Sequence, residues 1–392
     1  ILEIYGKMIP SRLNRVVFIA SYLNSKDLIR LQRVLGQLPY PCAPLIAPKR
    51  VPVVPKLRSG LKLIGENGRF ENLLQKIIPN QIPTAYVEYY LEMRRKSLSS
   101  FPENPRVIYT ANALLGSEGF TFWIATQVER GAKLVSSQHG GHYGTAAWSA
   151  NESHEIRVSD RYFSWGWGKS GQPKVVSYPS GQLAGLKPNI SPNPKGRILW
   201  VGISFTRFSR QLLSIPMSRQ TLDYLKDQER FARAVLPEVH ELLIKRIFPA
   251  DYGWNEELRW ANMDPELEVY YGEKTMYEQL NESRLCVGTY NSTTDLETLS
   301  RNYPTIIFFD PDLSELRKSA QPFFDDLRRV GIYHTTPESA AAKVNEIYQD
   351  PISWWNSNKV QEVRSRFCRQ FARTSATWIS EWKEAFQEIM EG

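Results

Sequence analysis

The stretch "RLCVGTYNSTTDLETLSRNYPTIIFFD", residues 284–310, decides the fold. An apolar run at 284–290 is followed by a polar, helix-like segment at 291–302 and by a second apolar run at 304–310. Short apolar runs bounded by turn residues indicate buried strands, and a helix between two such strands is the building unit of a parallel sheet. The stretch therefore predicts a strand, a helix and a strand of an α/β fold.

The same alternation continues in both directions along the chain. Helical patterns at 25–38, 118–131 and 315–331 alternate with strand-like runs, which lie at 15–23, 106–110, 132–137, 197–204 and 240–248. A Pro- and Gly-rich segment at 178–196 has the composition of a linker between domains. We therefore expect two Rossmann-like lobes with a cleft between them. Their expected bounds are 1–185 and 186–375, with a C-terminal helix at 376–392 that packs on the body.

Composition narrows the classes of function. The 392 residues hold 49 Lys and Arg against 41 Asp and Glu, and the net charge of +8 is spread along the chain. This suits an anionic ligand or an acidic membrane surface, as well as an ordinary protein surface, and is too diffuse for nucleic acid. Three cysteines without CxxC spacing argue against a disulfide framework, so a cytoplasmic location is expected. A chain that opens at Ile1 without Met is consistent with a piece of a longer protein.

The second half contains a candidate nucleotide site. Residues 289–294 lead from a strand end to the expected start of a helix, where free backbone N–H groups and hydroxyls can bind phosphate. Glu297 lies one turn into that helix and could accept hydrogen bonds from a ribose. Alternatively, Thr294 and Glu297 form an ordinary capping box. Asp295 must point away from a bound phosphate if the first interpretation holds.

Two arginines follow strands of the same half. Arg207 and Arg246 come after the runs at 197–204 and 240–248. A guanidinium binds a diphosphate or a sugar carboxylate with two hydrogen bonds. An exposed arginine is, however, more often a solvated surface charge.

The first half contains a candidate catalytic cluster. "SSQHGGHYGT" (136–145) and "ESHEIRVSDRYFSWGWG" (152–168) place histidines and carboxylates on loops expected above a parallel sheet. Such groups supply the base, the nucleophile and the charge stabilisation that glycosyl transfer needs. Trp165 and Trp167 could stack on a sugar or form a core pair. A zinc site at His139 and His142 lacks a further ligand fixed by spacing, and no GxSxG, Walker or GxGxxG motif is present.

Several motifs in this order resemble a family of bacterial transferases from surface-polysaccharide loci, which is similar to retaining β-Kdo transferases of lipopolysaccharide O-antigen synthesis. The likeness covers roughly residues 105–375, and the quoted motifs are "SSQHGGHYG", "SDRYFSWGWG", "DYGW" and "YNSTTDLETLSRNYPTIIFFDPDLSELRKSAQPFF". The resemblance implies a GT-B-type glycosyltransferase with acceptor on the first lobe, nucleotide sugar on the second, and no obligatory metal or cofactor.

The resemblance also implies roles for individual residues. Asp160 is the expected nucleophile or base, because it precedes the expected strand at 161–167 and should lie at a strand edge facing the cleft. Glu155 and His139 are expected to act as acid/base groups or to hold the acceptor. The acceptor is expected to contact His142, Tyr143, Trp165 and Trp167. The donor is expected to contact Arg207, Arg246, Tyr290, Asn291, Ser292, Thr293, Thr294 and Glu297. Asp295 stands where family members often carry an aromatic or aliphatic residue, which bears on the nucleotide contact.

The leading hypothesis is transfer of a sugar, such as Kdo from CMP-Kdo with retention, onto a surface polysaccharide such as the O-antigen of lipopolysaccharide. The partners would be a nucleotide sugar and a glycan or lipid-linked glycan, with peripheral association at the inner face of the cytoplasmic membrane and no nucleic acid. One alternative is a nucleotide-sugar epimerase. The other is a non-catalytic glycan-binding subunit of a polysaccharide assembly complex.

Overall fold

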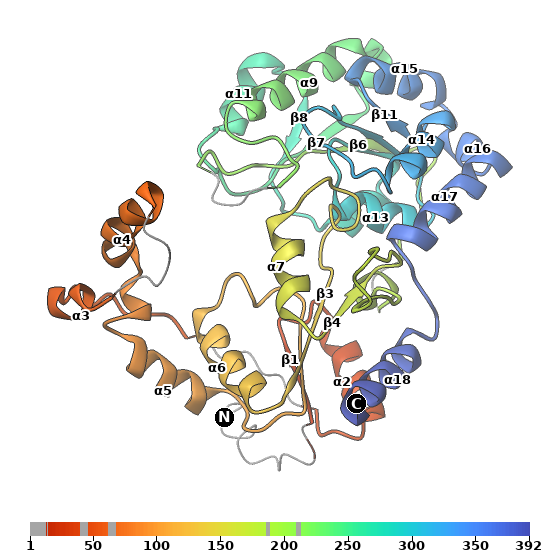
Figure 1. The fold of residues 1–392 in the computed structure, drawn as a ribbon. Helices are drawn as coiled ribbons and strands as arrows, with labels where there is room; N and C mark the ends of the chain where they lie inside the picture. The colour runs from red at the N-terminus through yellow and green to blue at the C-terminus, as the bar shows by residue number, and fades with distance from the viewer. Residues whose placement is uncertain (1–12, 14, 40–45, 62–67, 186–188, 209–212) are drawn as a thin grey trace. The chain divides into compact units, whose positions relative to one another are not determined.

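A computed structural model describes residues 13, 15–39, 46–61, 68–185, 189–208 and 213–392 (Figure 1). The contacts within the chain divide it into two compact units. Unit 1 comprises Ile1–Tyr22, Leu28–Ser136 and Lys383–Gly392, and unit 2 comprises Leu23–Asp27 and Ser137–Trp382.

The described strands form two parallel α/β sheets. The change from the first sheet to the second falls between β5 (Val175–Ser177) and β6 (Arg197–Val201). This is the segment that its prolines and glycines mark as a linker. Two parallel sheets in one chain fit the GT-B layout and confirm the predicted fold class.

In unit 1 the strands β1 (Val16–Ile19), β2 (Val107–Thr110) and β3 (Lys133–Ser137) pair in this order and run parallel. All residues of β1 and β2 are buried, as expected for strands that are covered on both faces. The helical elements between β1 and β3 are α2 (Ser25–Val34), α3 (Pro55–Ser59), α4 (Arg69–Gln81), η2 (Thr84–Tyr86), α5 (Tyr90–Ser100) and α6 (Glu118–Glu129). All belong to unit 1 except the first residues of α2, which belong to unit 2.

The core of unit 1 forms where α6 packs on its neighbours. Ser117 caps α6 by accepting a hydrogen bond from the Phe120 N–H. Phe120 and Trp123, one helical turn apart, are fully buried, and the Trp123 ring stacks on Phe101 with 4.9 Å between ring centroids. Residues 46–54, in a Pro-rich passage before α3, form neither helix nor strand.

Unit 2 contains β4 (Arg161–Ser164), which pairs with β5, and a six-stranded parallel sheet in the order β11-β10-β9-β6-β7-β8. The further strands of this sheet are β7 (Leu243–Arg246), β8 (Glu268–Tyr270), β9 (Ser283–Gly288), β10 (Thr305–Phe308) and β11 (Tyr333–His334). The helices are α7 (Ala150–Val158), α8 (Gly181–Ala184), α9 (Gln220–Ala234), α10 (Pro237–His240), α11 (Glu256–Met263), α12 (Met276–Asn281), α13 (Thr293–Ser300), α14 (Gln321–Arg329), α15 (Pro337–Ile347), α16 (Pro351–Trp355), α17 (Asn358–Phe371) and α18 (Trp378–Glu391), whose last part belongs to unit 1.

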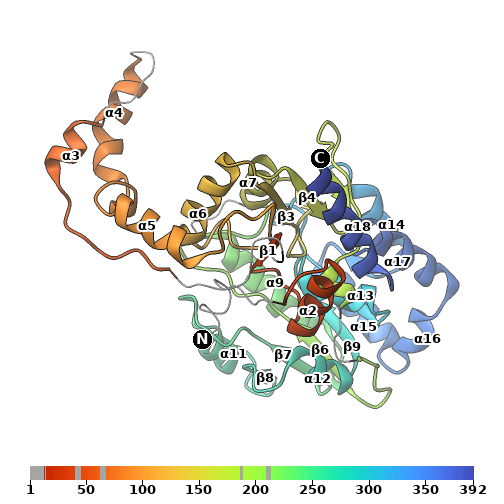
Figure 2. The ribbon, with the colours of Figure 1, turned by 90° about the horizontal axis from the view of Figure 1, so that it is seen from below.

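Aromatic side chains fill the core beneath α9 and α15, which lie side by side in Figures 1 and 2. Trp200 of β6 is fully buried and packs against Phe231 and Trp260, with ring centroids 5.1 Å away in both cases. Phe231 in turn stacks on Phe308 of β10. These contacts explain why the apolar runs of the second half form central strands.

The structure corrects one local prediction near the candidate catalytic cluster. Residues 150–158 were expected on a loop, but they form α7, which Ser149 caps by accepting a hydrogen bond from the Glu152 N–H. The segment carries few apolar residues, so its hydrophobic pattern does not predict a helix. Its buried side includes Glu155, which is therefore held by a helix.

Candidate active site

The Gln138 side chain fixes the loop that follows β3, residues 138–145, through three hydrogen bonds. The Gln138 Oε1 atom accepts hydrogen bonds from the Trp165 N–H at 3.1 Å and from the Trp167 Nε1–H at 2.7 Å. Its Nε2 group donates to the Gly140 carbonyl at 2.9 Å. The amide thus fixes where the loop leaves the strand, although sequence patterns gave Gln138 no role.

Two glycines of this loop are required by close contacts. A Cβ atom on Gly141 would lie 2.0 Å from the Ser292 carbonyl carbon. Gly144 has a positive φ of 75°, and a Cβ there would lie 2.4 Å from the Trp167 indole nitrogen. The glycines therefore serve close packing of the backbone.

A histidine, a tyrosine and a glutamate meet on this loop and α7. The Tyr143 hydroxyl donates to Glu155 Oε1 at 3.0 Å and lies 3.3 Å from His139 Nε2. Tyr143 and Glu155 are fully buried, whereas the His139 side chain keeps an exposed fraction of 13%. We call these three residues the His139 group. Two of the three predicted catalytic residues, His139 and Glu155, thus lie together, joined by Tyr143, a predicted acceptor contact.

Burial sets the protonation states around this group. It raises the pKa of Glu155 to about 9, against the lowering effect of the hydrogen bond from Tyr143. It lowers the pKa of His142 to about 4, with a further contribution from the neighbouring His139. At neutral pH Glu155 is therefore a neutral acid and His142 a neutral imidazole, which contacts the Ser149 hydroxyl at 3.3 Å.

A partly buried ion pair between Arg317 and Glu152 fixes the end of the loop at Gly144 and Thr145. Glu152 of α7 accepts from the Gly144 N–H at 2.8 Å, and its two oxygens lie 2.9 and 2.8 Å from the outer nitrogen of Arg317. Arg317 also donates from Nε to the Ala146 carbonyl and from its backbone N–H to the Thr145 carbonyl. Arg317 was missed at the sequence level, because no spacing links it to a glutamate 165 residues earlier.

The start of α13 differs from the predicted capping box. The cap is Ser292, which accepts from the Asp295 N–H, and the Asp295 carboxylate accepts from the Ser292 N–H. The box is therefore two residues earlier than Thr294 and Glu297. Asp295 folds back toward β9, since a Cβ on Gly288 would lie 2.1 Å from its Oδ1, and burial raises its pKa to about 7.

The loop after β3 is joined to the start of α13. The Gly141 N–H donates to Thr293 Oγ1 at 3.1 Å, and Asn291 Nδ2 donates to Thr145 Oγ1 at 2.7 Å. Thr294, Tyr290 and the half-buried Glu297 lie on the same turn and helix, and the Tyr277 hydroxyl donates to Glu297 at 3.4 Å. Unit 2 thus holds the His139 group and the predicted phosphate-binding turn together.

One predicted arginine follows β6 and the other ends β7, the neighbouring strand of the same sheet. Arg207 is exposed on the loop after β6, donates to the Gly253 carbonyl at 3.4 Å, and lies over the Trp254 ring at 5.7 Å. Arg246, the last residue of β7, donates to the Lys274 carbonyl at 3.1 Å and to the side chain of Gln279. Arg207 is the more accessible of the two to an anionic ligand.

The structure does not bring Asp160 to the His139 group. Asp160 is exposed and precedes β4, at the amino end of that strand. Trp165, which contacts Gln138 below the loop, follows the carboxyl end of β4. Trp165 and Trp167 are 3% and 2% exposed within the core, the arrangement of the core pair that the sequence left open beside sugar stacking.

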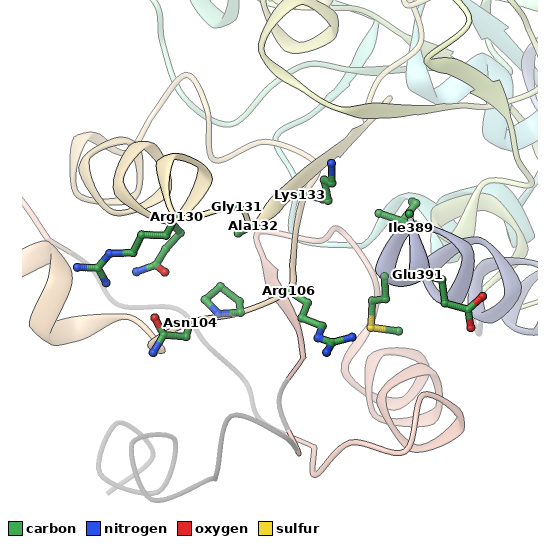
Figure 3. A pocket seen from close by; sticks show the side chains of 12 residues that line it. Asn104, Arg106, Arg130, Gly131, Ala132, Lys133, Ile389 and Glu391 are labelled. Atoms are coloured by element: carbon green, nitrogen blue, oxygen red, sulfur yellow. The ribbon is translucent and has the colours of Figure 1, made fainter.

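A cavity of about 480 Å³ lies in unit 1, at the amino ends of β2 and β3 (Figure 3). Arg106 and Arg130 line it, but their side chains point to different sides, so they do not converge on one ligand. Ligands in parallel α/β sheets bind at the carboxyl ends of strands. We therefore place the candidate active site at the loop after β3 and the start of α13.

Among the described residues, no helix combines the length and apolarity needed to cross a membrane. Within the same ranges, no three His, Cys, Asp or Glu side chains gather in a way that could hold a metal ion.

Comparison with known proteins gives a family match and structural likenesses. Residues 2–386 match the model of the LIC12162 family transferase. Curated protein sequences give no significant match. Similar solved structures include MurG from Acinetobacter baumannii, with 12% identity, a TM-score of 0.43, and coverage of 95% of this chain and 99% of that chain. They also include the spinosyn rhamnosyltransferase SpnG with spinosyn aglycone (11%, 0.42, 96% and 100%) and the wall teichoic acid polymerase TagF (10%, 0.42, 99% and 92%).

Proposed function

Because the chain belongs to the LIC12162 family of transferases, we propose that it is a glycosyltransferase that moves a sugar from a nucleotide to a glycan. The observation that carries the proposal is the hydrogen-bonded junction in unit 2. There the loop that bears His139 meets the Ser- and Thr-rich start of α13 through Gly141 and Thr293. An acid/base group and a phosphate-binding turn are the two parts that glycosyl transfer from a nucleotide requires.

The start of α13 would bind the donor phosphate. The first turn of a helix offers unpaired N–H groups and a positive dipole end, and Thr293 and Thr294 add hydroxyls. The carboxylate of Asp295 is turned back into its own cap, so it does not face the phosphate. Glu297 and Tyr290 would contact the nucleoside, and Arg207 a further phosphate or a sugar carboxylate.

His139 would be the acid/base residue. In the transfer step the acceptor oxygen bonds to the anomeric carbon, the bond to the phosphate oxygen breaks, and the phosphate leaves with the electron pair. The hydroxyl proton passes to the His139 imidazole. Tyr143 and Glu155 hold that ring in place, and Glu155, neutral at pH 7, accepts the Tyr143 hydrogen bond without acting as a nucleophile.

The finer assignment follows the motif resemblance. We propose Kdo from CMP-Kdo as the donor, retention at the anomeric carbon, and a surface glycan such as the lipopolysaccharide O-antigen, free or lipid-linked, as the acceptor. Retention needs either two displacements with a carboxylate nucleophile, the role predicted for Asp160, or a front-face attack. The single step described above for His139 is the front-face route, because Asp160 lies at the amino end of β4, away from the His139 group. His142 would assist acceptor binding. The protein would work in the cytoplasm at the inner face of the membrane, and the proposal assigns no metal or cofactor.

Thermal unfolding of the chain with CMP, UDP, GDP and dTDP tests the donor. A ligand at about 100 times its dissociation constant adds about 2.7 kcal/mol of stability. We expect the largest shift in melting temperature with CMP. A larger shift with another nucleotide would contradict the Kdo donor but keep the transferase. Donor conversion without an acceptor would indicate an epimerase instead, and glycan binding with no nucleotide effect would indicate a binding subunit.

A further inference from the structure

We propose that α3 and α4, with the segment before α3, dock the protein onto an anionic lipid surface. The apolar residues of this α3–α4 surface are exposed by 42% to 64%, and they are Val53, Val54, Leu57, Phe70, Leu73 and Ile77. The inference rests on the proposed function and deepens it, because it names the part of the chain that would meet the membrane in which a lipid-linked acceptor sits. Its test uses vesicle binding, which is independent of catalysis.

Helix α4 is weakly packed within the described part of the chain, although its Pro79 carbonyl accepts a hydrogen bond from Arg58 of α3. None of its 13 residues is buried. Figures 1 and 2 both show α3 and α4 standing apart from β1 and β2 of the same unit. A single helix of this length is marginally stable in water, since helices gain most of their stability from packing an apolar face. We infer that another surface covers α4 in the working protein.

The residues of α4 are arranged as in a helix that lies at a membrane interface. With about 100° per residue, Phe70, Leu73 and Ile77 fall within an arc of about 60°. Arg69 and Lys76 lie at one edge of this arc, and Glu71 lies on the opposite side. Basic side chains beside an apolar stripe can reach lipid phosphates while the stripe enters the acyl region.

Most of the net charge of the chain lies in this region. Residues 46–61 and 68–100 hold nine Lys and Arg against three Glu, an excess of six within the net +8 of the whole chain. The exposed cations nearest in sequence to the apolar residues are Lys49, Arg50, Lys56, Arg69 and Lys76. Each basic residue near an anionic membrane strengthens binding about fivefold.

A buried ion pair attaches the α3–α4 surface to the rest of unit 1. Arg58 of α3 binds Glu88 with its Nε and outer nitrogen at 2.7 and 2.8 Å, and both side chains are almost fully buried. Arg58 also donates to the Pro79 carbonyl of α4, and Glu88 accepts from the Val54 N–H. This contact lowers the pKa of Glu88 to about 2. One pair thus links α3, the end of α4 and the approach to α5.

The charge favours lipid over a second copy of the chain. A second copy would present the same excess of positive charge, so pairing of two α3–α4 surfaces would bring like charges together. An anionic bilayer supplies both the opposite charge and an apolar interior. A nucleic acid would match the charge but would leave Phe70 and Leu73 without an apolar partner.

Co-sedimentation of the full chain with phosphatidylcholine vesicles, with and without phosphatidylglycerol, tests the proposal. We expect binding only when phosphatidylglycerol is present, and weakening of that binding by added salt. Phe70→Ser/Leu73→Ser and Arg69→Gln/Lys76→Gln should each weaken binding by at least about tenfold. Because α4 has no buried residue, these substitutions should leave the thermal unfolding of the protein unchanged.

Matched variants elsewhere control for general loss of apolar surface. Leu236→Ser/Leu258→Ser removes two leucines of unit 2 that are 41% and 53% exposed, and it should bind vesicles like the wild type. Equal binding by the α4 variants, or no vesicle binding by the wild type, would overturn the proposal. So would self-association that the α4 variants abolish without vesicles. Vesicle binding by a chain that shows no transfer activity would support the docking surface and contradict the proposed function alone.

Discussion

At the scale of single residues, Glu155 shows how burial decides chemistry. A carboxyl group on a loop above a sheet, as the sequence suggested, would be ionised at neutral pH. On the buried side of α7 its pKa is raised to about 9, so it accepts the Tyr143 hydrogen bond as a neutral acid. The residue types could be predicted from the motif, but this protonation state could not, because it depends on burial by segments distant in sequence.

Three conservative substitutions separate the roles of the catalytic candidates. Glu155→Gln keeps a neutral acceptor of the same shape, so we expect it to retain most transfer activity at pH 7. His139→Gln should reduce kcat by about 10² to 10⁴-fold, the usual contribution of a general acid or base. Steady-state kinetics with CMP-Kdo and a glycan acceptor would measure both, with the shift in melting temperature on adding CMP as the control for donor binding.

Asp160→Asn completes this set. If Asp160 is the nucleophile, the variant loses transfer while it binds CMP as the wild type does. Retained transfer by Asp160→Asn together with loss in His139→Gln would assign the chemistry to the His139 group alone. Loss of activity in Glu155→Gln equal to that in His139→Gln would instead contradict the neutral role of Glu155.

Asp295 gives a pH dependence of stability. Its pKa is raised from 3.8 to about 7 in the folded state, so between these values the folded protein binds more protons than the unfolded chain. The contribution of Asp295 to stability is therefore full below about pH 4 and falls as the pH rises to about 7. Asp295→Asn should remove this decline and be at least as stable as the wild type at about pH 8. Melting temperatures of both proteins from about pH 5 to 8 would check it; a steeper decline in the variant would contradict it.

At the scale of elements, the strands and helices around 284–310 were predictable because apolar runs and turn residues mark them. Which residue caps α13 could not be predicted, because "NSTTDLE" contains two pairs of a Ser or Thr and an acid with the same spacing. The short strands β5, β8 and β11 also escaped prediction, because three residues or fewer leave no readable pattern. Helix α7 escaped for a different reason, its polar composition.

The junction of the loop after β3 with α13 makes a matched pair of glycine substitutions informative. Gly141→Ala would place a Cβ 2.0 Å from the Ser292 backbone, so we expect a loss of about 1–3 kcal/mol in the free energy of unfolding and weaker nucleotide binding. Gly140→Ala would place its Cβ 3.6 Å from Thr293 Oγ1, an ordinary contact, and should be tolerated. Denaturant unfolding of both variants would measure this. Equal stability of the two variants would contradict the prediction, because it would show that the backbone shifts to accommodate the added methyl group.

At the scale of the whole molecule, two α/β sheets were predictable from the alternation of patterns and from the linker composition. The change of sheet between Ser177 and Arg197 falls within the predicted linker. The lobe bounds at 1–185 and 186–375 stay predictions. The net charge was judged diffuse from the sequence, yet the described residues of 46–100 carry most of it. Only the exposure of α4 connects that excess with an apolar surface.

Unit 2 contains both the His139 group and the start of α13. We therefore expect a bound nucleotide to protect backbone amides of unit 2 from hydrogen exchange. Hydrogen exchange of the full chain with and without CMP should show slower exchange at the first turn of α13 and in the loop after β3. The amides of α4 and α5 should exchange alike in both samples. Protection confined to unit 1 would contradict the placement of the donor.

The Gly141 junction also bears on inhibitor chemistry. A compound could carry a phosphate mimic for Thr293 and a hydrogen-bonding group for the His139 imidazole. It would need a linker of one length, because both residues belong to one packed part of the protein. Binding of such a compound would order little of the protein, because folding has already fixed the loop and the helix that hold the two anchors. Medicinal chemists could therefore optimise the two ends separately and join them late.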